Sequence, residues 1–379
     1  MNETPRTIVF VGGGTGGHLQ PGVVLREELK RRHPDWKLPF LLAGRAVEKS
    51  FVTPEATGLE LFPGRTSRPA PWRADLYARA WFNAARFLAK AKPDLLVFLG
   101  GYVAFIARFA RLRAPMVLLE SNVLPGRSAR LAAPFAKRVF LQWLPPAEAR
   151  LPDWRARVTG MPLKFETLPG QREARRRLGL RPDARVLLVL GGSLGANAIN
   201  ERLLAGAADL AQQRGLQLLH LTGPRDEEKV QHAYAMAGVD AKVLPFCDDM
   251  AACYAAADLV VARAGGMTVA EIAAAGRPAL FLPYPHHADR HQEWNARVLV
   301  DAGAAWRVDE AATGADFVAR HVLPKLADPD ELEARGRKAF ALGRRDGTRR
   351  IVEEIEQLLD RSAGVQRIGQ TALAALQAL

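Results

Sequence analysis

The chain has 379 residues, of which 49% are hydrophobic and 25% are charged. This composition is ordinary for a folded protein of about two to three domains, and it excludes disordered, collagen-like and low-complexity classes. Two cysteines, Cys247 and Cys253, are too few for a disulfide framework and fit a reducing compartment. We expect no signal peptide, and no membrane-spanning segment because the longest apolar run, at 95–107, is interrupted by glycines.

The net charge of +13 is unevenly distributed along the chain. Residues 65–155 carry 16 Lys and Arg against five Asp and Glu, so most of the excess lies in the first half. A localised basic stretch indicates an anionic partner, such as nucleic acid, acidic lipid or phosphate. The alternative is a solvated basic surface with no partner.

Elements of the first half follow a simple alternation. A short apolar strand at 7–11 runs into glycines, and a helix is expected at 19–32. Further strands are expected at 40–42, 95–99 and 116–119, and helical patterns separate the later ones. Continuous apolar strands that alternate with helices predict a parallel sheet covered on both faces.

The same pattern restarts after Pro162. Strands are expected at 185–190, 216–221, 242–245, 259–261 and 278–282, and helices from about 196 and near 226–237, 248–256, 268–275 and 288–302. We therefore predict an α/β protein of two Rossmann-like, doubly wound domains that face a cleft. Ligands of such sheets bind at the carboxyl ends of the strands.

The domain boundaries are expected where the pattern breaks. Residues 1–162 form the first domain and residues 163–344 the second. A late helix at about 345–360 is expected to pack back on the first domain, and residues 361–379 form a tail.

Four glycine turns follow strands. The first, Gly12 to Gly17, contains G-x-G-x-x-G, and the others are Gly100-Gly101-Tyr102, 191–195 and 264–266. Bare backbone approaches a phosphate or sugar closely, and a helix N-terminus favours negative charge. A dinucleotide fingerprint needs an acidic residue at the end of the second strand, where the chain instead has 43–45, Ala-Gly-Arg. We therefore expect a phosphate-rich or sugar ligand approached from both domains.

Two polar positions allow both a functional and a structural interpretation. His18 opens a helix, where a positive helix end favours the neutral imidazole of a general base; a residue that shapes the loop is the alternative. Thr268 to Glu271 fits a capping box, T-x-x-E. Alternatively, Thr268 and the helix start hold a diphosphate and Glu271 accepts hydrogen bonds from a ribose diol.

A histidine-rich loop and a basic helix complete the candidate features. His286, His287, Asp289 and His291 match no zinc spacing, so we expect no metal and interpret this loop as a cleft lining in which Gln292 meets sugar hydroxyls. Residues 76–92 predict an amphipathic helix. Its basic and polar face is Arg79, Asn83, Arg86 and Lys90, and its apolar face is Tyr77, Trp81, Ala84 and Leu88. This helix either packs on the sheet as a surface helix or contacts an anionic membrane, aided by Trp72, Phe82, Arg65, Arg68 and Arg73.

The longest motifs resemble the MurG glycosyltransferase family. They are GGGTGGHLQPG at 12–22, LGGYV at 99–103, GGSLGANAIN at 191–200, and the segment 246–296 that begins FCDDM and ends QEWNA. The resemblance covers residues 7 to about 355 and implies the GT-B fold. It further implies an inverting transferase of peptidoglycan biosynthesis, which moves N-acetylglucosamine from UDP to the 4-hydroxyl of N-acetylmuramic acid-pentapeptide on undecaprenyl pyrophosphate.

The resemblance also implies partners and a location. The partners are UDP-N-acetylglucosamine, the lipid-linked muramyl pentapeptide and the anionic inner membrane surface, with no nucleic acid. The enzyme is expected to lie peripherally on the cytoplasmic face of the cell membrane and to use no cofactor and no metal.

Site residues follow from the same resemblance, one position at a time. The donor-binding positions are Thr15, Gly16, Gly17, Asn122, Lys164, Ser193, Cys247, Gly266, Met267, Thr268, Val269, Ala270, Glu271 and Gln292. Within this set, the Cys247 backbone is expected to meet uracil, residues 266–271 to cradle the diphosphate and end on the ribose ligand, and Gln292 to meet the donor sugar. His18 is the candidate base, and Gly100, Gly101 and Tyr102 lie on the acceptor side.

Three departures from the family pattern concern donor affinity and specificity. The usual His-Glu-Gln-Asn is Leu119-Glu120-Ser121-Asn122, the usual arginine is Lys164, and the usual serine is Ala264. A related glycosyltransferase for another lipid acceptor remains an alternative. Two further alternatives are an NADP-binding Rossmann oxidoreductase and a non-catalytic subunit.

Overall fold

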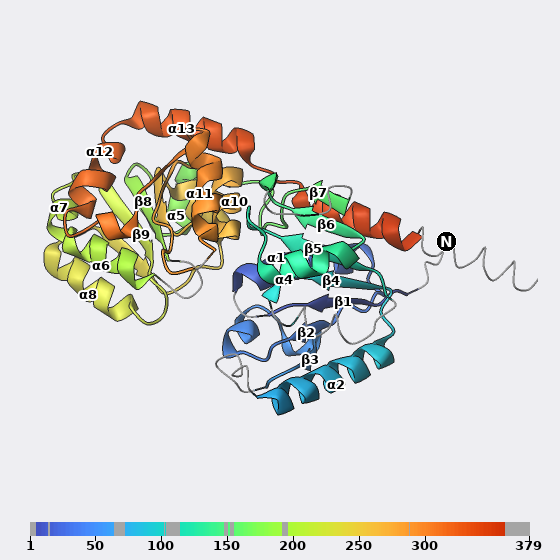
Figure 1. Ribbon diagram of the computed structural model, residues 1–379. Helices are drawn as coiled ribbons and strands as arrows, with labels where there is room; N and C mark the ends of the chain where they lie inside the picture. Colours follow the sequence, from blue (N-terminus) through green and yellow to red (C-terminus); the bar gives the residue numbers. More distant parts are fainter. Residues whose placement is uncertain are drawn as a thin grey trace, which may run out of the picture.

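The computed structural model describes residues 5–13, 16–63, 73–101, 103, 114–147, 151, 155–191, 196–287 and 289–360. Within these residues the strands form two separate sheets, and every strand pair is parallel (Figure 1). Of the described helices, none is long and apolar enough to cross a membrane.

The first sheet has seven strands in the order β3-β2-β1-β4-β5-β6-β7. Their bounds are β1 Ile8–Val11, β2 Phe40–Leu42, β3 Thr57–Glu60, β4 Leu95–Phe98, β5 Met116–Glu120, β6 Arg138–Leu141 and β7 Ala156–Val158. Among the described residues before 163, its α-helices are α1 Gly16–Arg32, α2 Ala74–Ala91 and α4 Arg127–Ala132. Side chains alternate between two cores, so that Ile8 and Phe10 pack with α1 while Val9 and Val11 pack with α2.

The second sheet has six strands in the order β10-β9-β8-β11-β12-β13. Their bounds are β8 Arg185–Leu190, β9 Leu216–Leu221, β10 Ala241–Leu244, β11 Leu259–Ala262, β12 Ala279–Phe281 and β13 Ala305–Arg307. The helices are α5 Gln171–Arg177, α6 Asn197–Ala205, α7 Ala207–Ala211, α8 Glu227–Ala237, α9 Met250–Ala256, α10 Gly266–Ala275, α11 His291–Asp301, α12 Leu323–Leu326 and α13 Pro329–Leu342. The core that contains α1 continues without a break through Met161 and Phe165 into α9 and α10, so the two halves pack against each other.

The chain crosses between the halves at two adjacent points. Gly160, at φ +83°, would place a Cβ 2.7 Å from the Cβ of Arg344, and Gly347 would place one 2.6 Å from the Met161 carbonyl oxygen. Side chains larger than hydrogen would therefore separate the outgoing and returning segments.

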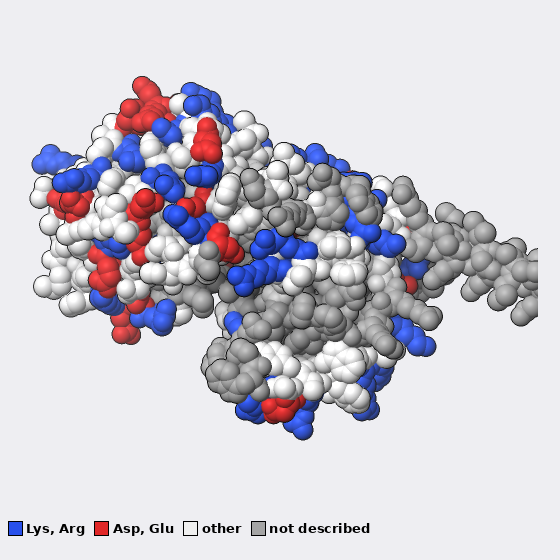
Figure 2. All heavy atoms as spheres, in the orientation of Figure 1, with Lys and Arg blue, Asp and Glu red and all other residues white. Residues whose placement is uncertain are grey.

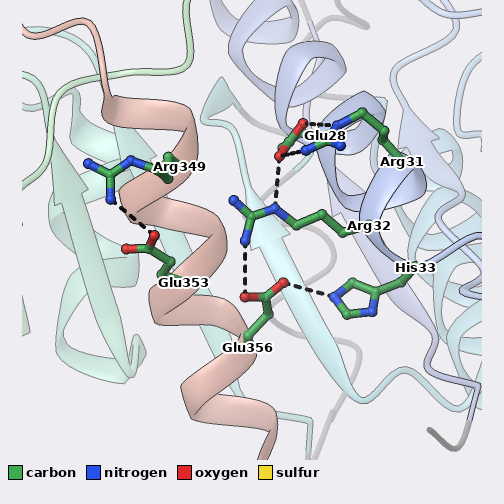
Figure 3. Close-up of polar contacts among 7 residues, drawn as sticks. All are labelled: Glu28, Arg31, Arg32, His33, Arg349, Glu353 and Glu356. Atoms are coloured by element: carbon green, nitrogen blue, oxygen red, sulfur yellow. Dashed lines mark hydrogen bonds and ion pairs between the residues drawn. The ribbon is translucent and has the colours of Figure 1, made fainter. Parts of the chain in front are cut away.

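A helix at 347–360 returns to the first sheet, where Ile351, Val352 and Ile355 are fully buried. The Glu356 carboxylate lies 3.4 Å from Arg32 Nη1 and 2.8 Å from His33 Nε2, both at the end of α1 (Figure 3). Arg32 and Arg31 also bind Glu28, which holds the pKa of that carboxyl at about 2. The carboxylates of this helix thus complement the basic last turn of α1.

Helix α2 packs on the sheet partly through other residues than predicted. Ala84 and Leu88 are buried as expected, but Ala80 takes the buried place predicted for Trp81. Trp81 is 40% exposed and Phe82 is 59% exposed, beside the exposed Arg79 and Arg86. The outer face of α2 is therefore both aromatic and basic. Trp72, Arg65 and Arg68 lie outside the described residues.

Candidate active site

The glycine turns that follow β1 and β4 interlock. A Cβ on Gly12 would lie 2.7 Å from the Leu99 Cβ, and one on Gly101 would lie 2.7 Å from the Gly13 carbonyl oxygen. Gly100 and Gly101 have φ values of +97° and +78°, which only glycine adopts readily. The two turns therefore form one floor at the carboxyl edge of the first sheet. Thr15, Tyr102 and Ser193 lie outside the described residues.

His18 lies in the first turn of α1, next to Gly100 of these turns. Its ring carbon Cδ2 would lie 3.1 Å from a Cβ on Gly100. Burial, and secondly the nearby His291, lower the pKa of His18 below its ordinary value of 6.5. The imidazole is therefore neutral at neutral pH and able to accept a proton. It shares a small cavity of about 40 Å³ with Gly17, Gly100 and Asn122.

Asn122 joins the two halves of the molecule. Its side-chain amide donates to Glu120 Oε1 at 3.0 Å, and its Oδ1 accepts from Asn295 Nδ2 at 3.0 Å. Asn295 is fully buried in α11, donates also to the Ala264 carbonyl and accepts from the Val123 backbone, each at 2.9–3.0 Å. The bonds to Val123 and Asn122 join the two domains, and the bond to Ala264 holds Asn295 within its own domain.

Glu120 holds the loop that contains Asn122 by hydrogen bonds. Its carboxylate also accepts from the backbone N–H groups of Asn122 and Gly126, at 2.9 and 3.0 Å. Burial nevertheless raises the pKa of Glu120 above its ordinary value. Neither Glu120 nor Asn295 was predicted as a site residue, although Glu120 lies in the segment 119–122 that was compared with the family pattern and Asn295 lies in the motif segment 246–296.

The point at which helix α10 begins rules out the capping box predicted for Thr268 and Glu271. Helix α10 begins at Gly266 with Gly265 as its N-cap, two residues before the predicted start, so Thr268 lies inside the helix. The Glu271 carboxylate accepts instead from the Tyr254 hydroxyl at 2.8 Å and from Gln20 Nε2, on α1 of the facing domain, at 3.1 Å. Burial raises the pKa of Glu271 to about 7.

The start of α10 lies against the first domain. A Cβ on Gly266 would be 2.8 Å from the Ser121 carbonyl oxygen, so this glycine permits close contact. The side chains of Met267, Val269 and Ala270 are buried in the core. Met267 can therefore meet a ligand through its backbone N–H, because the N–H groups of the first helical turn are not used inside the helix, whereas the Val269 N–H is already hydrogen-bonded there.

A second, larger cavity of about 410 Å³ lies between the domains. It is lined by Gln20, Val23, Val24, Glu27, Ser50, Phe51, Lys164 and 248–251. Lys164 lies near enough to Glu271 to lower its pKa slightly against the effect of burial. Cys247 directly precedes this lining, and a hydrogen bond with the Cys253 thiol lowers the pKa of the Cys247 thiol to about 7.

Gln292 is held by its own loop rather than by the other site residues. Its Oε1 accepts from the Tyr284 backbone N–H at 2.9 Å. The His287 and His291 rings of this loop lie against each other in a tilted arrangement, with ring centres 4.4 Å apart. Within the described parts of the chain, no three His, Cys, Asp or Glu side chains are grouped so as to hold a metal ion.

Comparison with known proteins places this chain in a family. The glycosyltransferase family 28 N-terminal domain matches residues 8–141, and the family 28 C-terminal domain matches residues 186–351. A protein of Carboxydothermus hydrogenoformans is 34% identical over 93% of this chain and 97% of its own length. One of Bordetella pertussis is 40% identical over 83% and 87%. Both are named UDP-N-acetylglucosamine--N-acetylmuramyl-(pentapeptide) pyrophosphoryl-undecaprenol N-acetylglucosamine transferase.

The chain belongs to this family of glycosyltransferases. The crystal structure of Acinetobacter baumannii MurG, a solved structure with 28% sequence identity, has a TM-score of 0.72 and covers 93% of this chain and 100% of its own. The predicted GT-B architecture and the predicted MurG resemblance are therefore confirmed. An oxidoreductase is not favoured.

Proposed function

We propose that the protein transfers N-acetylglucosamine from UDP-N-acetylglucosamine to the 4-hydroxyl of N-acetylmuramic acid-pentapeptide on undecaprenyl pyrophosphate. The supporting observation is the shared name of relatives that are 33–40% identical to this chain. The structure adds a buried carboxylate, a glycine-capped helix start and an interlocked glycine floor, all at the facing edges of the two sheets.

In this proposal the second domain, residues 163–344, binds the donor. Glu271 accepts the ribose hydroxyls, and the first turn of α10 meets the diphosphate, whose charge complements the positive helix end. Lys164 adds a positive charge at the rim of the larger cavity. The other proposed donor positions in this domain are Ser193, Cys247 and Gln292, and the first domain contributes Thr15, Gly16, Gly17 and Asn122.

The first domain, residues 1–162 with the helix at 347–360, binds the acceptor in the same proposal. Gly100, Gly101 and Tyr102 line the acceptor side. His18 takes the proton of the acceptor hydroxyl while this oxygen displaces the UDP leaving group with inversion. A neutral imidazole suits that role, and backbone N–H groups of α10 stabilise the leaving diphosphate.

We further propose that the outer face of α2 rests on the cytoplasmic surface of the cell membrane. Phe82 lies between Arg79 and Arg86 at helical spacing, and all three are exposed. Basic residues also dominate the visible charges of the first domain, whereas acidic and basic residues alternate over the second (Figure 2). An aromatic side chain flanked by arginines suits an anionic lipid interface.

The test is transfer of labelled N-acetylglucosamine from UDP to a synthetic lipid-linked muramyl pentapeptide. We expect a labelled disaccharide product from the wild-type protein and little from Glu271→Ala at low donor concentration. Diacylglycerol serves as the competing acceptor. Transfer to diacylglycerol with none to the muramyl lipid would support the related glycosyltransferase instead.

A further inference from the structure

Gln20 is hydrogen-bonded to the Glu271 carboxylate, the group proposed to bind the ribose of the donor. Its amide donates to Glu271 Oε1 at 3.1 Å across the domain interface, 251 positions away in sequence. Glu271 is 7% exposed, and its other oxygen accepts from Tyr254, a neighbour in the same domain that is 1% exposed. The orientation of Glu271 is therefore already held from within its own domain, and the Gln20 bond is an addition from the facing one.

We propose that Gln20 is a built-in competitor for the ribose, so that donor binding exchanges the Gln20 hydrogen bond for bonds from the ribose hydroxyls. This inference rests on the proposed function, which makes Glu271 the ribose ligand. An amide N–H and a sugar hydroxyl are both donors, and they compete for the same carboxylate lone pairs. Because Glu271 has so little open surface, the amide must withdraw before a diol can reach both oxygens.

The exchange couples the donor to the arrangement of the domains. Gln20 lies on α1, two residues after the candidate base His18, and it also lines the larger interdomain cavity with Lys164. Donor binding therefore breaks one hydrogen bond between α1 and α10, the bond from Gln20 to Glu271. The residue therefore acts on donor affinity and specificity, not on the reacting atoms.

The decisive experiment compares UDP binding by calorimetry in the wild type and in Gln20→Leu, which cannot donate. A net hydrogen bond of about 1 kcal/mol corresponds to about fivefold, so we expect UDP to bind Gln20→Leu about fivefold more tightly. The KM for the donor should fall by the same factor, with the acceptor KM unchanged. Gln213→Leu, the same change at an exposed glutamine whose amide donates to the Asp209 carbonyl of its own domain, is the matched control.

A second ligand isolates the ribose. With 2′,3′-dideoxy-UDP, which has no diol to compete, we expect wild type and Gln20→Leu to bind equally. Equal or weaker binding of UDP by Gln20→Leu would overturn the inference, because Gln20 would then be neutral or supportive. If Gln20→Leu loses thermal stability, Gln20→Asn, one methylene too short for the contact, should give the same tightening. Failure of the wild type to bind UDP at all would instead refute the proposed function.

Discussion

UDP binding should weaken as the pH falls through 7, because the ribose ligand itself titrates there. Burial raises the pKa of Glu271 from 4.5 to about 7, while hydrogen bonds from Tyr254 and Gln20 and the charge of Lys164 oppose this rise. Ribose hydroxyls donate to the ionised carboxylate and so favour its charged form. Protons and the nucleotide therefore compete for the same group.

The size of the effect follows from that pKa. Above pH 8 the free carboxylate is mostly ionised, and below pH 7 each further pH unit costs about 1.4 kcal/mol, or tenfold in affinity, as long as the bound form stays ionised. Between pH 8 and pH 6 the affinity should thus fall roughly tenfold. Binding at pH 7 should also release a substantial fraction of a proton.

Calorimetry in buffers of different ionisation enthalpy measures both quantities. The terminal phosphate of UDP titrates near pH 6 and contributes its own pH dependence. Glu271→Gln keeps the size of the side chain and cannot ionise, so its residual pH dependence belongs to the ligand. At pH 8 this variant should bind UDP more weakly than wild type, by about 1.5–3 kcal/mol. The same pH profile in wild type and Glu271→Gln would refute the reasoning.

Three further predictions concern the base, the domain interface and the membrane. His18→Ala should lower kcat by roughly a hundredfold with little change in UDP affinity; a matching loss of UDP affinity at nearly constant kcat would make His18 a binding residue. Asn295→Leu removes the hydrogen bonds to three partners, two of them buried, and should lower the free energy of unfolding in denaturant by about 3 kcal/mol; a loss below about 1 kcal/mol would contradict this. Replacing the three exposed cations of α2 by Gln should reduce binding to anionic vesicles several-fold and leave transfer to a short soluble acceptor intact. These cations are Arg79, Arg86 and Lys90. Binding of the wild type to neutral vesicles without salt dependence would instead indicate insertion through Phe82.

The sequence predicted the central strands well, because they are continuous buried apolar runs. β1, β4, β5 and β8 to β12 lie within one or two residues of the predicted ranges. Strands β3, β6, β7 and β13 were missed. β3, β7 and β13 are edge strands with mixed exposure, so their side chains carry no strong apolar pattern. β6, Arg138–Leu141, is buried but short and begins inside a basic stretch.

Helix α2 lies where it was predicted, but its buried face includes Ala80 and not Trp81. The pattern gave weight to Trp81 as a large apolar side chain, whereas the sheet packs against Ala80 and Ala84. Alanines permit a close approach between helix and sheet, and that approach leaves the bulkier aromatic residues outside. Composition alone does not distinguish an aromatic residue that fills a core from one that faces a lipid surface.

The site was predictable as a set of strand ends, but its hydrogen bonds were not. Gln20 meets Glu271 over 251 positions, and Asn122 meets Asn295 over 173, and no local pattern links residues so far apart. The capping-box hypothesis failed for the opposite reason, since it used only local spacing. A glycine N-cap moves the start of α10 two residues back, to Gly266. That shift leaves the first-turn N–H groups without a capping side chain and turns Glu271 toward the facing domain, and both consequences suit a site for a nucleoside diphosphate.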